Sequence, residues 1–231
     1  MGIFSQIAGL ASASAGRLGN ALSGVRAVLA SLAGSELRRE GAFAIAMIAL
    51  SAKMAKADGV VSRQEIDAFC SLFTIPLGEE RNVSRFYNLA RRDVAGYEAY
   101  ARDVARLLGD DPATLEAVLD GLFDIARADG AVHERELAYL ERVAEIFGLD
   151  EIAFARVRAR HVLNGADPYL VLGAEPDWDY ARLRRRYLKL VAENHPDRLV
   201  GHGVPEEFLR IASDRLAAIN AAWEKIERAR A

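Results

Sequence analysis

The segment His195-Pro196-Asp197, called the triplet below, places an imidazole and a carboxylate on either side of a proline. Such a pair could transfer protons in catalysis, coordinate a metal ion, or be presented to a binding partner. For catalysis, the sequence offers no serine or cysteine nearby in the setting of a nucleophile. For a metal site, the spacing to His202 matches no zinc pattern. An ordinary turn and a partner-binding motif remain as alternatives.

Acidic residues recur within an internal repeat of the sequence. The segment AKADGVVSRQEI at 55–66 returns as ARADGAVHEREL at 126–137, each time between two apolar helical stretches. Carboxylates on either side of such a turn could converge on one divalent cation, although the valine or alanine after the glycine excludes an EF-hand loop. Alternatively, each aspartate caps the turn and each glutamate caps the next helix. The residues in question are Asp58, Glu65, Asp129 and Glu136.

The elements that carry these residues are predicted to be helical throughout. Apolar residues recur every three or four positions along nearly the whole chain, and β-branched runs with a period of two are hard to find. This pattern predicts an all-α protein. The repeat predicts two helix hairpins in one bundle, with Gly59 and Gly130 in the left-handed conformation that ends a helix.

The triplet itself directly follows a helix with an apolar inner side. Pro196 disfavours helical geometry at His195, so that helix is expected to end by Asn194. After a glycine-bearing loop, Pro205 begins a last helix with one long apolar face. The sequence therefore predicts two antiparallel helices with the triplet in the loop between them, and we expect that loop to be exposed.

Shorter signals mark where this helical pair begins. Asp167 and Pro168 predict an N-cap followed by proline at the first helical position, and Gly173 predicts the C-cap of a short helix. Asp177 is then the expected N-cap of the next helix, with Asp179 in its first turn.

The helix before the triplet is strongly basic, with no acid among its cations. Such a face is merely solvated, or it meets nucleic acid, or it meets an acidic protein surface. The net charge of −3 and the lack of a clustered aromatic and basic surface argue against nucleic acid. The cations are Arg182, Arg184, Arg185, Arg186 and Lys189.

Length and composition set outer limits. A chain of 231 residues suits one large or two small domains. Cys70 is the only cysteine, which excludes an internal disulfide and fits a reducing compartment. The longest uncharged run, 1–16, is shorter than the roughly 20 residues of a membrane span. The segment 1–35 is therefore either an amphipathic helix that lies on a membrane surface through residues 1–34, or a partly folded tail.

Residues 36–163 resemble the TerB-like, or tellurite-resistance-type, helical domain. The resemblance rests on the doubled unit helix-Ala-Asp-Gly-x-Val-x-x-x-Glu-helix. It implies no enzymatic chemistry. In that family the acidic residues are proposed to bind a divalent metal, with roles in membrane-associated stress systems.

Residues 164–231 resemble the J-domain of the DnaJ co-chaperone family. A TerB-like bundle followed by a C-terminal J-domain is the order found in the DjlA type. Better-known members of that type have an N-terminal membrane span, from which this sequence departs. The matching segments are Tyr169 to Gly173, Leu183 to Leu190, His195-Pro196-Asp197-Arg198, and Ile219 to Ile226.

This resemblance implies a co-chaperone that is not itself an enzyme. A J-domain docks on an ATP-bound DnaK-type chaperone and stimulates its ATP hydrolysis, without a cofactor, a nucleic acid or a small-molecule substrate of its own. The implied location is the cytoplasm, or the cytoplasmic face of the inner membrane. The residues assigned to docking are His195, Pro196, Asp197, Arg198, Arg184, Arg185, Tyr187 and Lys189.

Two other classes of function stand beside it. One is a stress-related scaffold whose TerB-like half binds metal or a membrane complex, while the J-like half only packs. The other is a hydrolase that uses His195 and Asp197, which would show turnover without any partner protein.

Overall fold

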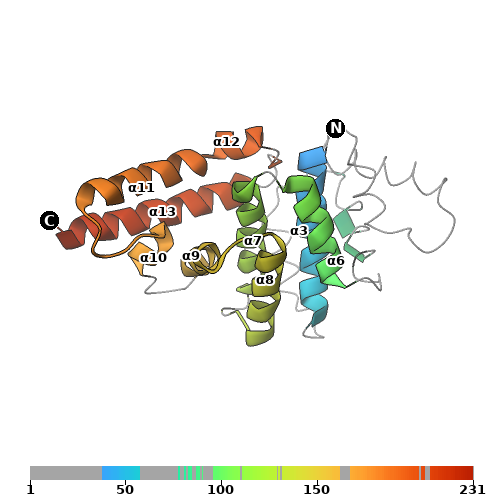
Figure 1. The fold of residues 1–231 in the computed structure, drawn as a ribbon. Coiled ribbons are helices and arrows are strands. Elements are labelled where there is room, and N and C mark those ends of the chain that lie inside the picture. The colour runs from blue at the N-terminus through green and yellow to red at the C-terminus, as the bar shows by residue number, and fades with distance from the viewer. Residues whose placement is uncertain are drawn as a thin grey trace.

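The structure is a computed structural model, and all secondary structure in its described part is α-helical (Figure 1). The prediction of an all-α protein is confirmed. Within that part, none of the helices is both long and apolar enough to cross a bilayer. Residues 1–35 lie outside it, so the two alternatives for this segment stay predictions. The described residues are 38–57, 78, 81, 83–84, 87–88, 90, 96–109, 111–128, 130, 132–161, 167–202, 204–205 and 209–230.

Five of the described helices, all before residue 162, pack together into a structure called the bundle below (Figure 1). Helices α3 and α7 form its centre, because their side chains are apolar on nearly every side. A helix that is apolar all round is stable only when it is buried on all faces. Phe43, Met47, Tyr100 and Phe123 are fully buried there. The helices are α3 (Arg38–Ala57), α6 (Tyr97–Leu108), α7 (Pro112–Ala126), α8 (Glu134–Ile146) and α9 (Glu151–His161).

The second copy of the repeat lies between α7 and α8, as the sequence predicts. Gly130 has a φ of 115°, the left-handed region that glycine enters without strain. The matching Gly59 lies outside the described residues. The helix pair α7 and α8 therefore has the predicted connection.

The C-terminal part forms a second unit, called the hairpin below, in which α11 and α13 lie antiparallel and side by side (Figure 1). Its small core contains Leu183, Leu190, Ile219, Trp223 and Ile226. The short helix α10 covers this core near the start of α11 and the end of α13, called the open end of the pair. The elements are α10 (Pro168–Leu172), α11 (Tyr180–Glu193), α12 (Pro196–Gly201) and α13 (Leu209–Arg230).

Most of the predicted helix ends in the hairpin occur where the sequence places them. The Asp167 carboxylate accepts a hydrogen bond from the Tyr169 N–H at 2.9 Å, and Gly173 has a φ of 59°. The prediction that Asp177 caps the next helix is wrong. Asp179 has the extended backbone of an N-cap, and its carboxylate accepts from the Arg182 N–H at 2.7 Å. Trp178 packs against the hairpin core, so the chain turns into the helix only after it.

The prediction that the triplet and the residues after it form a loop is also wrong from Pro196 onward, because Pro196–Gly201 form α12. Pro196 occupies the first helical position, where its missing N–H is harmless and its fixed φ suits a helix. The outer side of α12 is exposed, and its inner side enters the bundle. Leu199 and Val204 are buried in the bundle core, together with Ile211 and Ala212 from the start of α13. The end of the hairpin at which α12 connects α11 to α13, called the closed end, therefore packs directly on the bundle.

Candidate partner-binding site

The triplet occupies the junction between α11 and α12. His195 is the N-cap of α12, and its Nδ1 accepts a weak hydrogen bond from the Asp197 N–H at 3.3 Å. The same nitrogen lies 3.6 Å from Oδ2 of Asp197. Pro196 separates the two residues and fixes the backbone between them. One imidazole and one carboxylate are thus presented with little freedom of relative position.

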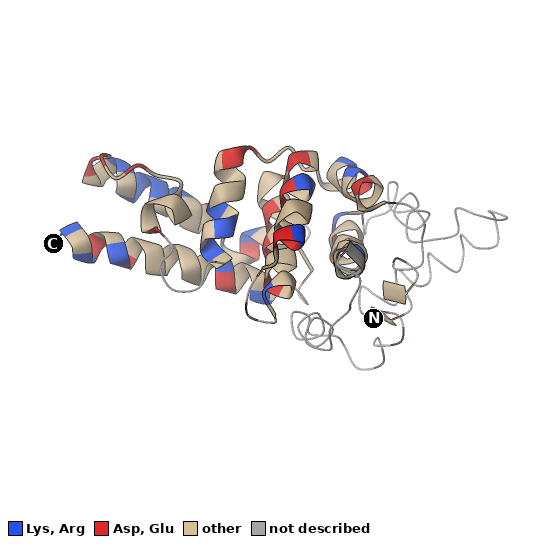
Figure 2. Cartoon of the chain, turned by 90° about the horizontal axis from the view of Figure 1, so that it is seen from below, with Lys and Arg blue, Asp and Glu red and all other residues tan. Residues whose placement is uncertain are grey.

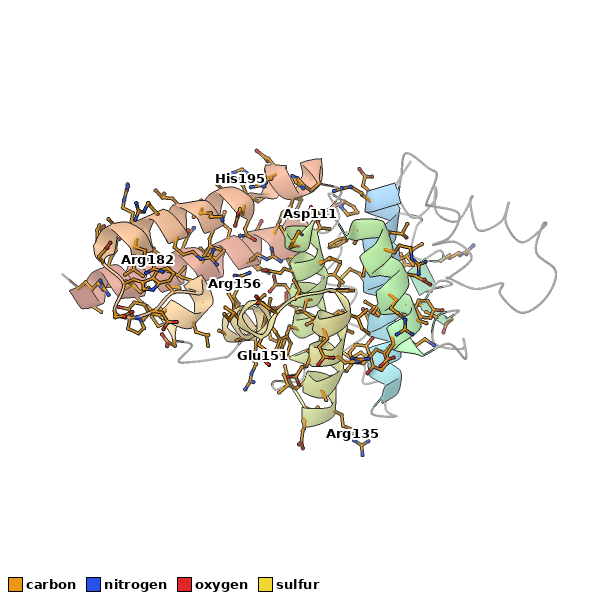
Figure 3. All side chains as sticks on the ribbon, viewed as in Figure 1. Asp111, Arg135, Glu151, Arg156, Arg182 and His195 are labelled. Atoms are coloured by element: carbon orange, nitrogen blue, oxygen red, sulfur yellow. The ribbon has the colours of Figure 1, made fainter. Side chains whose placement is uncertain are left out.

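Both side chains of this pair face solvent. The His195 side chain is 52% exposed and that of Asp197 is 91% exposed. Figure 3 shows His195 on the outer side of the hairpin, near the end of the bundle where Asp111 lies. Arg198, the next residue, is exposed as well. The triplet is therefore accessible, although the helix that carries it is anchored on its other side.

The basic face of α11 lies beside the triplet. Figure 2 shows lysine and arginine along α11, whereas acidic and basic residues are mixed along α13. Arg184, Arg185 and Lys189 are exposed, and Lys189 forms only a loose ion pair with Glu193 at 3.7 Å. Leu188 among them is 45% exposed. The result is a positively charged face with an apolar spot, next to an exposed imidazole and carboxylate.

Tyr187 has a different place from the other predicted docking residues. Its ring stacks on that of Trp223, with 4.8 Å between ring centroids and 6° between planes. Its hydroxyl hydrogen-bonds to Oδ1 of Asn220 at 3.1 Å. The side chain is half-buried and joins α11 to α13, so most of its surface is used within the hairpin.

Of the four acidic residues of the repeat, only Glu136 lies within the described part of the chain. Its carboxylate accepts from the backbone N–H of His133 at 2.9 Å and the residue is buried, as a helix cap would be. Asp58, Glu65 and Asp129 are outside that part. Among the described residues, there is no group of three or more potential metal ligands. Whether the repeat binds a divalent cation stays a prediction.

A buried group of charged residues at the contact between bundle and hairpin is absent from the sequence-based predictions. Asp120 of α7 is at its centre, with Oδ1 3.1 Å from Nε of Arg160 and 2.8 Å from Nε2 of His161. Oδ2 of the same carboxylate is 2.5 Å from Nε of Arg215 in α13. The members of this group, called the charge cluster, are Glu116, Asp120, Arg156, Arg160, His161 and Arg215.

The charge cluster shifts the protonation of its members. Burial raises the pKa of the Asp120 carboxyl, but Arg160 and Arg215 outweigh burial and hold that pKa far below its ordinary value. Burial lowers the pKa of the His161 imidazole, but hydrogen bonds to Asp120 and Asp124 outweigh burial and raise that pKa above 6.5. Asp120 is therefore a carboxylate at neutral pH, fixed by cations from two sides.

A signal for the charge cluster exists in the sequence. Glu116, Asp120 and Asp124 stand one turn apart in a helical stretch that is mainly apolar, and Arg215 lies on the apolar face that continues through Ile219. Charged residues at positions that periodicity assigns to a core are almost always paired when buried. The sequence thus indicates that these residues need partners, but it does not say which ones.

The closed end of the hairpin has a second polar contact with the bundle. Nδ1 of His202, directly after α12, lies 2.8 Å from Oδ2 of Asp111, which is the N-cap of α7. Nη1 of Arg39 in α3 lies 3.9 Å from the same carboxylate oxygen. The far end of the segment that begins with the triplet is thus held by bundle residues.

The family described as tellurite resistance protein TerB matches residues 44–159, just over half of the chain. These residues cover α6 to α8, most of α3 and nearly all of α9, and they include Glu116 and Asp120 of the charge cluster. No solved structure matches the chain.

Several proteins named co-chaperone protein DjlA are similar to the chain, two of them over more of its length. The one from Aliivibrio fischeri is 26% identical, over 84% of this chain and 81% of its own. The one from Coxiella burnetii is 26% identical, over 77% of this chain and 73% of its own. The one from Escherichia coli K12 is 29% identical over 48% of this chain and 54% of its own. The predicted resemblance to the DjlA type is confirmed.

Proposed function

This chain belongs to the family of tellurite resistance protein TerB, and we propose that it is a DnaJ-like co-chaperone that docks on a DnaK-type chaperone and stimulates its ATP hydrolysis. The observation that carries the proposal is the exposed pair of His195 and Asp197, held on either side of Pro196 next to a basic helix face. The similarity to co-chaperones of the DjlA type over most of the chain supports it.

Docking begins with electrostatic attraction. The exposed cations Arg184, Arg185 and Lys189 suit an acidic surface on the chaperone's ATPase domain. Contacts of this kind raise the association rate and set orientation more than they raise affinity. The basic face therefore brings the triplet to its binding site in one orientation.

The triplet then makes the specific contacts. Asp197 offers a carboxylate that is almost fully exposed, so it can accept a charge-assisted hydrogen bond from a cation of the partner. His195 offers an imidazole that packs and hydrogen-bonds beside it. Because Pro196 and the cap of α12 already fix both residues, little conformational entropy is lost on binding. The chain thereby changes the rate of another protein's reaction.

The test is steady-state ATP turnover by a DnaK-type chaperone with and without this chain. The native chain should raise turnover, and His195→Gln should remove the stimulation while the melting temperature stays nearly unchanged. A stability change within about 0.5 kcal/mol is usual for an exposed side chain. His133→Gln, a histidine at the start of α8, is the matched control and should stimulate like the native chain. Full stimulation by His195→Gln would disprove the site.

A further inference from the structure

Arg215 is a cation in the middle of α13 whose side chain is only 1% exposed. It lies on the same face as Ile211, Ala212 and Ile219, which are all buried. A buried guanidinium is tolerated only where partners compensate for the lost water. The partners of Arg215 therefore show which elements this side chain joins.

The partners come from both units of the protein. Nε of Arg215 donates to Oδ2 of Asp120 at 2.5 Å, on the bundle side. Nη1 donates to Oδ1 of Asn194 at 2.6 Å, on the hairpin side. The same nitrogen also donates to the carbonyl oxygen of Ala113 at 3.2 Å, on the bundle side. One planar side chain thus joins α7 to the last turn of α11.

Asn194 immediately precedes His195. Its Nδ2 donates to the carbonyl oxygen of Leu190 at 2.7 Å, so its buried amide is held from two sides. Its backbone N–H bonds to the same carbonyl at 3.0 Å. Any displacement of Arg215 therefore moves the residue to which the triplet is attached.

The bundle side of this connection is rigid. Nε and Nη2 of Arg160 bind the two oxygens of Asp120 at 3.1 and 3.0 Å, and His161 binds one of them at 2.8 Å. Asp120 therefore has little freedom to follow Arg215. The position of Arg215 is dictated by the bundle.

We propose that Asp120, Arg215 and Asn194 form a positioning relay, through which the TerB-like bundle sets the orientation of the His195-Pro196-Asp197 triplet for its partner. The inference rests on the proposed function and adds a role for the bundle in it. The bundle is then part of the docking device, and Arg215 and Asn194 are positioning residues for the triplet.

The far end of α12 supports the same conclusion. Leu199 is buried in the bundle core, and His202 is paired with Asp111. The triplet is thus fixed before its first residue through Asn194 and after its last through α12. Only its outer surface is left for a partner.

The test is the substitution Asn194→Ala. It removes the hydrogen bond between Arg215 and Asn194 and leaves the ion pair between Arg215 and Asp120 in place. In full-length Asn194→Ala, the concentration of chain that gives half-maximal stimulation of a DnaK-type ATPase should rise about tenfold, since a hydrogen bond to a charged group is lost. The rate at saturation should stay within about twofold, because lost pre-organisation weakens binding rather than the bound state.

Amide hydrogen exchange gives a second measurement that needs no chaperone. The N–H groups of Arg198 and Leu199 bond to the carbonyl oxygen of His195 at 3.0 and 3.1 Å. Their exchange should be about tenfold faster in Asn194→Ala, because the start of α12 is released from the bundle.

Two further variants separate positioning from mere helix capping. Asn194→Asp keeps an oxygen for Arg215 but loses the bond to Leu190, so it should retain native stimulation and exchange. Asn88→Ala is the control, since Asn88 also donates to the carbonyl four residues before it, that of Ser84 at 2.9 Å, but is exposed and distant in sequence from the triplet. It should change neither measurement.

The outcomes distinguish the relay from the proposed function. Native half-saturation and native exchange in Asn194→Ala would overturn the relay, and so would an Asn194→Asp variant that behaves like Asn194→Ala. If the native chain does not stimulate the chaperone at all, the proposed function fails. The exchange rates then decide the relay alone.

Discussion

Asp120 and Arg215 form an ion pair across the contact between bundle and hairpin, with 2.5 Å between Oδ2 and Nε, although the two residues are 95 positions apart in the sequence. Both side chains are almost completely buried. Together with the burial of Leu199 and Val204 in the bundle core, this pair makes the two units share one interior. Stability and presentation of the triplet are therefore coupled.

Asp120→Asn should destabilise the protein strongly. The variant leaves Arg215 as a buried cation without its ion-pair partner and leaves Arg160 paired with Glu116 alone, and an uncompensated buried charge typically costs about 3–5 kcal/mol. The free energy of unfolding in urea measures the loss. Asp214→Asn, on the exposed face of α13, is the control and should change it by less than about 0.5 kcal/mol. A loss of similar size in both variants would contradict the role of the charge cluster.

His161 should make stability depend on pH near neutrality. Asp120 and Asp124 of α7 face its ring nitrogens, Arg160 lies next to it, and its ring stacks on that of Phe123. Its pKa is raised in the folded state above the ordinary 6.5, so the folded protein binds the proton more tightly than the unfolded chain. The stabilisation is complete below pH 6.5 and is lost as pH rises through the folded pKa.

The measurement for His161 is the urea midpoint at pH 6 and pH 8, which should be lower at pH 8 for the native chain. His161→Gln should reduce this difference, because the group that gains the proton is gone. His133→Gln should retain the native difference. If the urea midpoint changed equally between pH 6 and pH 8 in the native chain and in both variants, groups other than His161 would cause the pH dependence.

The positive charge of α11 should control how much of the chain is needed to stimulate the chaperone. Arg184→Ala combined with Arg185→Ala should raise the half-saturating concentration for ATPase stimulation several-fold at low salt. The gap to the native chain should narrow as salt is added, because exposed charges are screened within roughly 8–10 Å at physiological ionic strength. Arg228→Ala, which removes an exposed cation near the C-terminal end of α13, should follow the native salt curve. A salt-independent defect would point to altered folding.

Glu136→Ala tests the two interpretations of the repeated acidic residues. As a helix cap, Glu136 should contribute about 0.5–2 kcal/mol to stability, by the hydrogen bond to the His133 N–H. The melting temperature should then fall by the same amount with and without added Ca²⁺ or Zn²⁺. If the native chain melts higher with the cation and the variant does not, Glu136 is a metal ligand in solution.

Local rules account for what the sequence predicts correctly. The ends of α10 at Asp167 and Gly173, and the end of α11 at Asn194, depend on a few neighbouring residues whose backbone preferences are strong. The choice of Asp179 over Asp177 depends instead on how Trp178 packs. The accessible triplet follows from its place between two helices.

Long-range pairing explains what the sequence does not predict. Asp120 and Arg215 are charges at core positions of their helices and Asn194 caps α11, but nothing local names their partners. Their contact arises only when α7, α11 and α13 are brought together. The helix α12 escapes prediction because its six residues are stabilised largely by Leu199 and by the bundle beneath it. Neither feature has a periodic pattern of its own.

The position of α12 has a geometric consequence for any protein that grips His195. Because the closed end of the hairpin contacts α3 and α7, the bundle covers one side of the segment that follows that residue. Asp111 and Arg39 of the bundle lie at this end of the hairpin, beside the segment that follows the triplet. A protein that binds His195 along α11 would therefore lie close to residues of both the hairpin and the bundle.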